Sequence, residues 1–556
     1  MIFHDSQNLY YRSPIGAVPT QSFVRLAIDV DLKDKVSLVR LHTWQETCGS
    51  IYYNLKKSSW DEKHYFIDLD MPEDGCLVWY YFIIELADGK LLYYGNNKAQ
   101  MGGIGQEALE VPPSYQITVF KKDVKTPDWF KKAVMYQIFP DRFYRSGNNI
   151  PQKKHAALHC DWNEPPMYYL DPDTKNVITY DYFGGNIQGI KEKLSYLKDL
   201  GISVIYFNPI FKSRANHHYD TADYHQVDPM FGTNEEFAQL CSQAKEMGIR
   251  IILDGVFSHT GSDSIYFNRF GNFDSVGAYQ SKESPYYEWY DFKEYPCKYD
   301  CWWGFTSMPN TKETTPSYMD FIIRSEDSVM NFWMDKGISG WRLDVIDELP
   351  QKFTRCFYQK LKKLDKDAVI IGEVWEDASN KIAYNVHREY LCGYEMDSAM
   401  NYPLRRIILD FILKNKSAQE TEVSILNQHE NYPEENLYAM MNLLGSHDVE
   451  RILTLLGEAP SVENVPASVQ AKFKLDDAHL RLAIARLKLA VVWQMTLPGV
   501  PSIYYGDEIG MQGYRDPHNR ASYKWDEADN NLRHFFTRMI ALRNHRQVLQ
   551  TGWYIP

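Results

Sequence analysis

The sequence has little cysteine, no excess of basic residues and no long apolar run. Its 8 cysteines are scattered over 556 residues, unlike the dense spacing of a disulfide framework, and this favours a reduced compartment. With 60 basic against 73 acidic residues, the net charge is −13. That sign does not suit a surface that follows a phosphate backbone, so we do not expect nucleic acid as a partner.

Signals for membrane insertion or export are also missing. The sequence contains no run of about 18 or more apolar residues, which is the length a membrane-spanning helix needs. Its first stretch, MIFHDSQNLYYRSP, does not have the basic, apolar and small-residue order of a signal peptide. We therefore expect a cytoplasmic protein with no membrane partner, or a secreted one if a leader has been removed.

Aromatic side chains are abundant. They make up 15% of the chain, with 40 Tyr and 14 Trp. Flat rings with polar edges suit ligands such as sugars, which offer apolar faces edged by hydroxyls, although core packing explains any single ring as well. The length predicts roughly two to four domains.

The first 122 residues predict a β-sandwich domain. Short alternating runs such as FVRLAIDVDL and LVWYYFIIEL are separated by turn sequences such as PEDG and ADGK. The stretch KKDVKTPDW interrupts this pattern with charge and proline. We therefore place the boundary of the N-terminal domain, residues 1–122, at this stretch.

Residues 123–548 predict an α/β fold in which helices and apolar strands alternate. In TNEEFAQLCSQAKEMGIRIILDGVF, Thr233 and Glu236 form a capping box, Gly248 ends the helix and an apolar strand follows. Such units build a parallel sheet covered on both faces. The candidate strands are AVMYQIF, SVIYFNP, IILDGVF, GWRLDV, VIIGEV, GYEMDS, YAMMNLL and PSIYYG. Eight strands predict a TIM (β/α)8 barrel, with a doubly wound open sheet as the alternative. The segment of about 260–322, after the third strand, is too long for a loop and predicts a subdomain over the barrel mouth.

Polar residues follow one strand after another at its carboxyl end. They are Asp254 and His259 in ILDGVFSHTG, Arg342 and Asp344 in GWRLDV, Glu373 in IIGEVW, and His447 and Asp448 in LLGSHD. Because the carboxyl ends of barrel strands form one face, we expect these side chains to meet there. Any one of them could be an ordinary buried polar residue with hydrogen-bond partners, but that does not explain polar residues at the ends of successive strands.

Three carboxylates at one barrel mouth, Asp344, Glu373 and Asp448, suit cleavage of a glycosidic bond. That reaction needs an acid for the leaving oxygen and a carboxylate across the ring, about 5 to 5.5 Å away in a retaining mechanism. Asp344 and Glu373 are 29 residues apart, which is one strand–helix–strand step. Arg342 points to the same side of its strand as Asp344 and should keep it ionised. Apolar neighbours should keep Glu373 protonated.

The motifs DGVFSH, GWRLDVIDE, GEVW and LLGSHD, in this order and spacing, resemble the conserved regions of glycoside hydrolase family 13, the α-amylase family. VMYQIFPDRF, YFNPIF, YDTADY and PGVPSIYYGDEIGMQG extend the resemblance along the predicted barrel. The N-terminal sandwich with FPDRF and EVW is similar to the cyclomaltodextrinase, neopullulanase and maltogenic amylase branch, or to the related amylopullulanases. The resemblance implies retaining hydrolysis of α-1,4 bonds, with α-1,6 bonds left open, in maltooligosaccharides, cyclodextrins, pullulan or starch.

The resemblance also implies a role for each matching residue. Asp344 is the expected nucleophile, Glu373 the acid/base, and Asp448 the third carboxylate, which binds sugar hydroxyls. The expected substrate-binding residues are Arg342, His259, His447, Tyr219, Trp375, Asp516 and Arg520. The N-terminal domain is expected to bind starch or to form a homodimer, and residues 549–556 are expected to begin a C-terminal β-domain that is otherwise absent.

Some positions depart from the family pattern. The chemistry requires no cofactor, but Asn148, Asn149 and Asn186 offer oxygen ligands for a structural calcium. Ser258 stands where the family usually has Asn, and MPNTKE replaces the expected MPKLN. An α-glucan transglycosylase or debranching enzyme is therefore an alternative. A glycan-binding protein with an inactive barrel is a second one, which the complete set of three carboxylates argues against.

Overall fold

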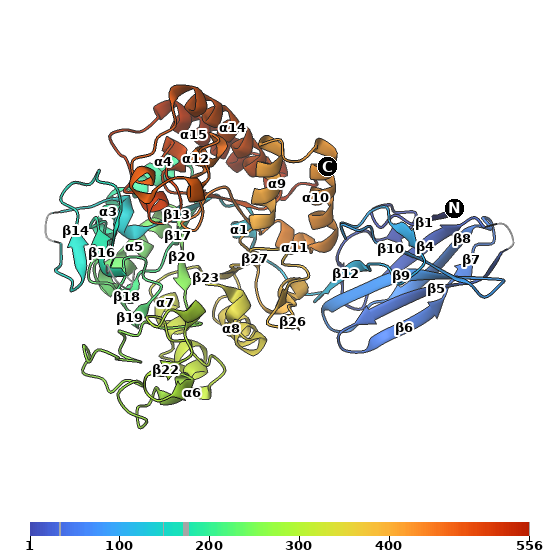
Figure 1. Cartoon of the computed structure of the whole chain (residues 1–556), viewed down its shortest axis with the longest axis horizontal. Coiled ribbons are helices and arrows are strands. Elements are labelled where there is room, and N and C mark those ends of the chain that lie inside the picture. The colour runs from blue at the N-terminus through green and yellow to red at the C-terminus, as the bar shows by residue number, and fades with distance from the viewer. Residues whose placement is uncertain (33–34, 148–149, 171–176, 555–556) are drawn as a thin grey trace.

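The structure is a computed structural model that describes residues 1–32, 35–147, 150–170 and 177–554. A β-rich N-terminal body lies beside a larger barrel surrounded by helices (Figure 1). Within the described ranges, none of the helices combines the length and apolar character that crossing a membrane requires. All eight cysteines are described, and each is a free thiol.

The N-terminal body is a sandwich of two mainly antiparallel sheets. One contains β1 (Ile2–Phe3), β2 (Arg12–Ser13), β4 (Phe23–Val30), β7 (Lys56–Lys57) and β8 (His64–Asp70). The other contains β3 (Val18–Pro19), β5 (Val36–Gln45), β6 (Gly49–Asn54), β9 (Cys76–Leu86), β10 (Leu91–Gly95), β11 (Gln106–Ala108) and β12 (Tyr115–Phe120). Alternate residues of β4 and β9 supply the core between the sheets, among them Val24, Leu26, Val78 and Tyr80. This alternation is the period of two that predicted the strands.

Eight parallel strands form the barrel. They are β13 (Met135–Ile138), β17 (Val204–Phe207), β20 (Arg250–Gly255), β23 (Gly340–Leu343), β24 (Val369–Gly372), β27 (Ser398–Ala399), β28 (Met441–Leu443) and β29 (Val500–Tyr504). Their order is β27-β24-β23-β20-β17-β13-β29-β28. A parallel bridge between Met400 and Met441 joins the two outer strands. The predicted TIM barrel is therefore confirmed, and the open sheet is excluded.

Amphipathic helices cover the outside of the barrel. The main ones are α3 (Ile187–Glu192), α4 (Leu194–Leu200), α5 (Asn234–Glu246), α7 (Val329–Asp335), α8 (Gln351–Leu364), α9 (Tyr402–Ile412), α10 (Ala418–Asn431), α14 (Asp477–Thr496) and α15 (Asn530–His545). The capping box predicted at α5 is present, since Glu236 N donates to Thr233 Oγ1 at 3.2 Å and Thr233 N to Glu236 Oε2 at 2.8 Å.

Two insertions stand at the barrel mouth. The predicted one, between β20 and α7, contains the hairpin β21 (Phe292–Glu294) and β22 (Lys298–Tyr299), the short helix η2 (Trp302–Gly304) and α6 (Pro316–Met319). The second precedes α3 and is a three-stranded sheet of β14 (Ala156–Leu158), β15 (Tyr168–Leu170) and β16 (Val177–Tyr182). The sequence did not predict it, because strands this short show no clear alternation.

Two predicted strands are wrong or displaced. GYEMDS does not form a strand along its length, since Gly393 with φ 96° lies in the helical turn η5 (Tyr390–Tyr394) and β27 begins only at Ser398. Residues 549–556 were expected to begin a β-domain, but α16 (Gln547–Thr551) is helical and no strand follows up to residue 554. The physical reason is the buried Arg543 of α15, which donates to the Leu549 carbonyl at 2.6 Å and holds the segment against that helix.

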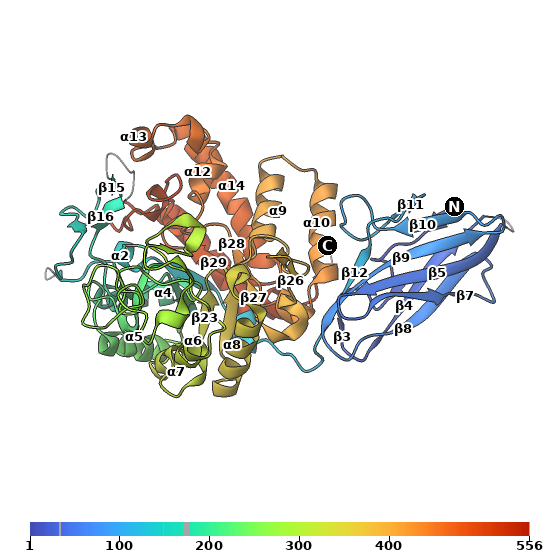
Figure 2. The same cartoon turned by 60° about the horizontal axis from the view of Figure 1, so that its bottom comes forward.

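The sandwich is fixed to the barrel through β12 and α10, which lie side by side (Figures 1 and 2). Arg12 Nη1 lies 2.8 Å from Glu430 Oε1, with both side chains buried. Thr118 Oγ1 donates to the Asn431 carbonyl at 2.7 Å. A buried charge pair with further hydrogen bonds fixes how the two bodies sit together.

Candidate active site

Three neighbouring barrel strands carry the charged centre of the site. Register pairs Asp254 of β20 with Arg342 of β23, and Arg342 with Ile371 of β24. Asp344 and Glu373 each follow directly after the end of a strand, β23 and β24 respectively. Since the strands are parallel and in register, their ends bring these side chains together, as the sequence predicted.

The Arg342 guanidinium contacts three carboxylates. Its Nη1 lies 2.7 Å from Asp344 Oδ1 and 2.8 Å from Asp254 Oδ1, and its Nη2 lies 2.7 Å from Glu373 Oε2. Tyr206 holds the far oxygen of Asp254, donating to Oδ2 at 2.7 Å. The sequence predicted the pair with Asp344, but it did not predict that one cation would serve all three acids.

This sharing changes the expected ionisation of the site. Burial raises the pKa of Asp344 well above its ordinary value, and the Glu373 and Asp254 charges add to this, against the opposing effect of Arg342. Burial likewise raises the pKa of Asp254. One positive charge cannot neutralise three buried carboxylates, so the group as a whole retains a proton more readily than isolated acids do. The prediction that Arg342 alone keeps Asp344 ionised is therefore incomplete.

Glu373 receives more hydrogen bonds than Asp344 in this structure. Besides Arg342, Val345 N donates to Glu373 Oε2 at 2.8 Å and Trp375 Nε1 donates to Oε1 at 3.0 Å. Val345 has a left-handed backbone with φ 33°, which is unfavourable for a β-branched residue and turns its N–H toward Glu373. These donors fix the orientation of the Glu373 carboxyl group, and the protonation of Glu373 by its apolar neighbours stays a prediction.

His447 is held as a neutral donor. Gln137 Nε2 donates to His447 Nδ1 at 2.9 Å, which places the ring proton on Nε2. Nε2 lies 3.2 Å from Asp448 Oδ2 and 2.5 Å from Tyr219 Oη, whose ring is stacked parallel to the imidazole. Burial and the nearby arginines lower the pKa of His447 well below its ordinary value, so the ring is neutral and its Nε2–H is shared between Tyr219 and Asp448.

His259 lines the cavity, but both its ring nitrogens have protein partners. Nδ1 lies 3.0 Å from Ser258 Oγ, and Nε2 donates to the Tyr219 carbonyl at 3.1 Å. Burial lowers the pKa of His259 to about 4. Ser258, which departs from the family pattern, therefore orients this imidazole.

Asp448, Asp516 and Arg520 form one chain of charge at the other side of the mouth. Arg520 Nη1 lies 3.0 Å from Asp516 Oδ1, and its Nη2 lies 3.7 Å from Asp448 Oδ1. Burial, and then the Glu373 charge, raises the pKa of Asp448 to about 7. Tyr168 donates to the Asp516 carboxylate at 2.6 to 2.7 Å. The sequence missed Tyr168 because its strand, β15, belongs to the unpredicted sheet.

Trp375 forms an aromatic surface beside Glu373. Its ring stacks on Tyr402 with centroids 3.9 Å apart and an interplanar angle of 6°, and 44% of the residue is exposed. An exposed ring held flat by a second ring is a ready-made stacking surface for a sugar.

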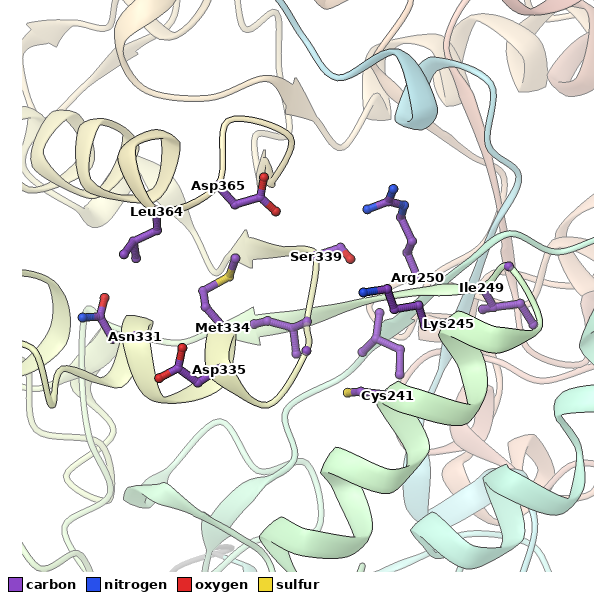
Figure 3. Close-up of a pocket in the computed structure, with 14 residues that line it drawn as sticks. Cys241, Lys245, Ile249, Arg250, Asn331, Met334, Asp335, Ser339, Leu364 and Asp365 are labelled. Atoms are coloured by element: carbon purple, nitrogen blue, oxygen red, sulfur yellow. The ribbon is translucent and has the colours of Figure 1, made fainter.

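Most of these residues line one cavity of about 760 Å³, but Arg342 and Trp375 are not among its lining residues. Of the predicted residues, those that line it are Tyr219, His259, Asp344, Glu373, His447, Asp448, Asp516 and Arg520. The two insertions add further lining residues, including Tyr168, Trp302 and Phe305. A second cavity of about 690 Å³ lies at the amino ends of β20 and β23, between Lys245, Arg250, Asp335 and Asp365 (Figure 3). Because it is at the opposite end of the strands, it plays no part in the carboxylate site.

Asn186, a predicted calcium ligand, has protein partners at both ends of its side-chain amide. Its Oδ1 accepts from Gly189 N at 2.7 Å, capping α3, and its Nδ2 donates to the Ser146 carbonyl at 2.9 Å. Asn148 and Asn149 lie outside the described residues. Among the residues that are described, no group of three or more His, Cys, Asp and Glu side chains is arranged to hold a metal ion. A structural calcium stays a prediction.

A (β/α)8 barrel with carboxylates at the carboxyl ends of its strands is an arrangement on which glycoside hydrolases are built. The chain belongs to the α-amylase family, because the sequence model of the family described as "Alpha amylase, catalytic domain" matches residues 137–550.

Similar proteins support the predicted branch of the family. The chain is 38% identical to the amylopullulanase of Thermoanaerobacter thermohydrosulfuricus, covering 99% of this chain and 39% of that protein. It is 32% identical to neopullulanase 2 of Thermoactinomyces vulgaris, covering 89% of this chain and 76% of that protein. The solved type III pullulan hydrolase from Thermococcus kodakarensis has a TM-score of 0.64 at 25% identity, covering 100% of this chain and 89% of the other. The chain spans about two fifths of the length of the amylopullulanase it matches.

Proposed function

We propose that this protein is a retaining α-glucan hydrolase, with Asp344 as the nucleophile and Glu373 as the acid/base. The observation that carries this proposal is the placement of both carboxylates on one guanidinium, at 2.7 Å each. Asp344 and Glu373 also follow the neighbouring in-register strands β23 and β24, where the short separation of a retaining pair is most easily reached. This favours the retaining over the inverting geometry.

The reaction proceeds in two steps. Asp344 attacks the anomeric carbon while Glu373 gives its proton to the glycosidic oxygen, and the leaving chain departs with that proton. Glu373 then takes a proton from water, whose oxygen displaces Asp344 and releases the sugar. The first step needs a proton on Glu373 and one of its oxygens at the leaving oxygen, so Oε2 exchanges its contacts with Val345 N–H and Arg342 for that oxygen as substrate binds.

The remaining residues hold the sugar at the cleavage point. Neutral His447 turns its Nε2–H from Tyr219 Oη to a sugar hydroxyl, and Asp448 next to it accepts from an adjacent hydroxyl. Tyr219 supplies the ring face, while Asp516 and Arg520 bind the next sugar toward the non-reducing end. His259 lines the same site, and its Nε2–H, which donates to the Tyr219 carbonyl, would likewise have to exchange that partner to bind a sugar directly.

The proposed substrates are α-1,4-linked glucans, with cleavage of α-1,6 bonds as a second activity. Relatives named amylopullulanase and neopullulanase support pullulan as a substrate. Transglycosylation uses the same glycosyl-enzyme, and no described contact favours sugar over water as its acceptor. Homodimer formation through the N-terminal domain and a cytoplasmic location stay predictions.

The test is to incubate the protein with maltotriose, pullulan, β-cyclodextrin and soluble starch, and to identify both the products and the anomer formed first. A retaining enzyme releases the α-anomer first, and release of the β-anomer would contradict the mechanism. Panose from pullulan indicates α-1,4 cleavage, whereas maltotriose indicates α-1,6 cleavage. Products longer than the substrate would favour the transglycosylase alternative.

A further inference from the structure

We propose that Tyr384, at the tip of the hairpin β25 (Ile382–Ala383) and β26 (Val386–His387), is a stacking platform for the leaving-group arm of the glucan. Trp303 of the inserted subdomain faces it as the other half of this platform. The inference rests on the proposed function and extends it, because it assigns residues that recognise sugars beyond the one next to the cleaved bond.

The hairpin is fastened at both ends to the loop that follows the nucleophile. On its first side, Lys381 Nζ lies 3.3 Å from Asp347 Oδ2. On its second side, Arg388 Nη1 donates to the Leu349 carbonyl at 2.9 Å and Tyr390 Oη donates to Asp347 Oδ1 at 2.7 Å. These contacts fix the position of the hairpin tip relative to Asp344, because Asp344 lies only a few residues before this loop in the sequence. This explains Asp347, a charged residue that the catalytic mechanism does not use.

The N-terminal domain supports the outer strand of the same hairpin. The ring of His387 lies 6.2 Å from that of Trp44 and 6.4 Å from that of Trp79. Aromatic rings at these separations are in the range of favourable edge and tilted contacts. The hairpin is therefore held between the sandwich and the barrel, although its tip projects into solvent.

Tyr384 has a conformation and an exposure that folding alone does not explain. It has φ 51° and the following Asn385 has φ 62°, so the tip is a two-residue turn with both residues left-handed. Asn and Gly suit such a turn, whereas Tyr does not. The side chain is 70% exposed, so packing does not compensate for the unfavourable backbone. A strained, exposed aromatic on a rigid mount is expected where a ligand uses it.

Trp303 shows the same combination on the facing subdomain. It has φ 47° and is 77% exposed. Its Nε1 donates to Glu348 Oε1 at 2.8 Å, and Tyr384 Oη reaches the same oxygen at 3.5 Å. Two exposed rings from separate parts of the fold therefore converge on one carboxylate. Glucose offers an apolar face to a ring and hydroxyls to a carboxylate, so this set suits a sugar.

The platform lies on the leaving-group side of the site. Glu373 gives its proton to the leaving oxygen, so the leaving sugar lies over Trp375, which contacts Glu373 Oε1. The hairpin follows Trp375 within a few residues of chain, and Glu348 lies in the loop beyond Asp344. Asp516 and Arg520 belong to the other side, next to Asp448. The glucan arm that leaves past Trp375 is thus the part that meets Tyr384.

The experiment compares two substrates in Tyr384→Ala. One is maltoheptaose, whose leaving arm is long enough to reach the platform, and the other is an aryl α-maltoside, whose leaving group ends at Trp375. Loss of one stacked ring should lower kcat/KM for maltoheptaose about tenfold, mainly through KM. The loss for the aryl maltoside should be much smaller, so the ratio of the two kcat/KM values falls. Trp303→Ala should change the ratio in the same direction.

Two further variants separate stacking from other effects. Tyr384→Phe keeps the ring, so the ratio of kcat/KM for maltoheptaose to kcat/KM for the aryl maltoside should stay close to that of the unmodified protein. Tyr52→Ala removes an exposed tyrosine from β6 of the N-terminal domain and should leave both values unchanged. An equal loss for both substrates in Tyr384→Ala, or no loss for either, would overturn the platform.

Failure of the proposed function has a different signature, because the unmodified protein would then cleave neither substrate. In that case calorimetric titration with maltoheptaose tests the platform directly. Weaker binding to Tyr384→Ala than to the unmodified protein supports it, and equal binding overturns it.

Discussion

Arg342 Nη2 lies 2.7 Å from Glu373 Oε2. The guanidinium that neutralises the proposed nucleophile therefore also contacts the proposed acid. Since the two carboxylates compete for one cation, the Glu373 charge adds to the effect of burial in raising the pKa of Asp344, and this addition depends on where the Glu373 side chain lies.

Asp344→Asn should reduce hydrolysis of a maltooligosaccharide by at least about 10⁴-fold, because the amide cannot form the glycosyl-enzyme. The fold should be retained, since Asn can still accept from Arg342. Initial rates and thermal denaturation measure the two effects. Asp365→Asn, at the opposite end of the barrel, is the matched control and should keep normal activity. Near-normal rates in Asp344→Asn would refute its role as nucleophile.

Arg342→Met should destabilise the fold by about 3 to 5 kcal/mol at neutral pH, because it leaves buried carboxylates without a counter-charge. Burial raises the pKa of Asp344 and Asp254, so protonation relieves the unpaired charge. The deficit relative to the unmodified protein should therefore be smaller at pH 5 than at pH 8. Urea denaturation at the two pH values measures it, and a deficit independent of pH would argue against charge as the cause.

Glu313→Gln should stabilise the protein at alkaline pH. Burial raises the pKa of Glu313 from 4.5 to about 8, so the native state binds a proton that the unfolded chain loses earlier. A raised pKa lowers stability as pH rises, and the difference between the two proteins should grow by up to about 1.4 kcal/mol per pH unit between about pH 4.5 and 8. Urea titrations at pH 4.5, 6 and 8 measure the difference in unfolding free energy between the variant and the unmodified protein. A constant difference across this range would contradict the prediction.

Tyr168→Phe should raise KM for maltooligosaccharides about threefold to tenfold with little change in kcat. The phenol hydroxyl holds Asp516 through a charge-assisted bond, and such bonds contribute about 1.5 to 3 kcal/mol, part of which is lost when the carboxylate turns to solvent. Steady-state kinetics on maltopentaose checks it. A fall in kcat with unchanged KM would place Tyr168 in the chemical step instead.

Arg12→Met should destabilise the protein by about 3 to 5 kcal/mol, because Glu430 remains buried without its partner. The double variant Arg12→Met/Glu430→Met should recover most of the loss, since apolar side chains of similar volume fill the same space. Chemical denaturation of the unmodified protein, the single variants Arg12→Met and Glu430→Met, and the double variant gives the coupling energy between the two side chains. Additive effects would show that the two charges act independently.

The sequence predicts the centre of this molecule well, because there the apolar runs that indicate strands end in the polar residues that indicate the site. Apolar runs ending in Arg342, Asp344 and Glu373 give strand, face and position together, and parallel register then brings the ends into contact. It fails where elements are too short for periodicity, as at β15 with Tyr168 and at β27 after Gly393. It cannot predict that Arg342 contacts three carboxylates, because this depends on distances between three strands rather than on any one of them.

The aromatic residues of the barrel mouth also show what sequence can and cannot predict. Trp375 follows the acid in a recognisable motif, so its place could be predicted. Tyr384 and Trp303 lie 81 residues apart, and only tertiary structure brings both to Glu348. No sequence periodicity connects a hairpin tip with a helix of three residues in another subdomain.

The pairing of Arg12 with Glu430 bears on how this protein can be divided. A break in pattern near residue 122 invites a cut there, but the barrel freed by such a cut would keep an acidic side chain in a pocket shaped for a guanidinium, and α10 would lose the strand that covers it. The hairpin of Tyr384 would also lose the indole rings that support it. The barrel is thus a separate unit in sequence pattern, but its stability and the outer part of its substrate path depend on the sandwich.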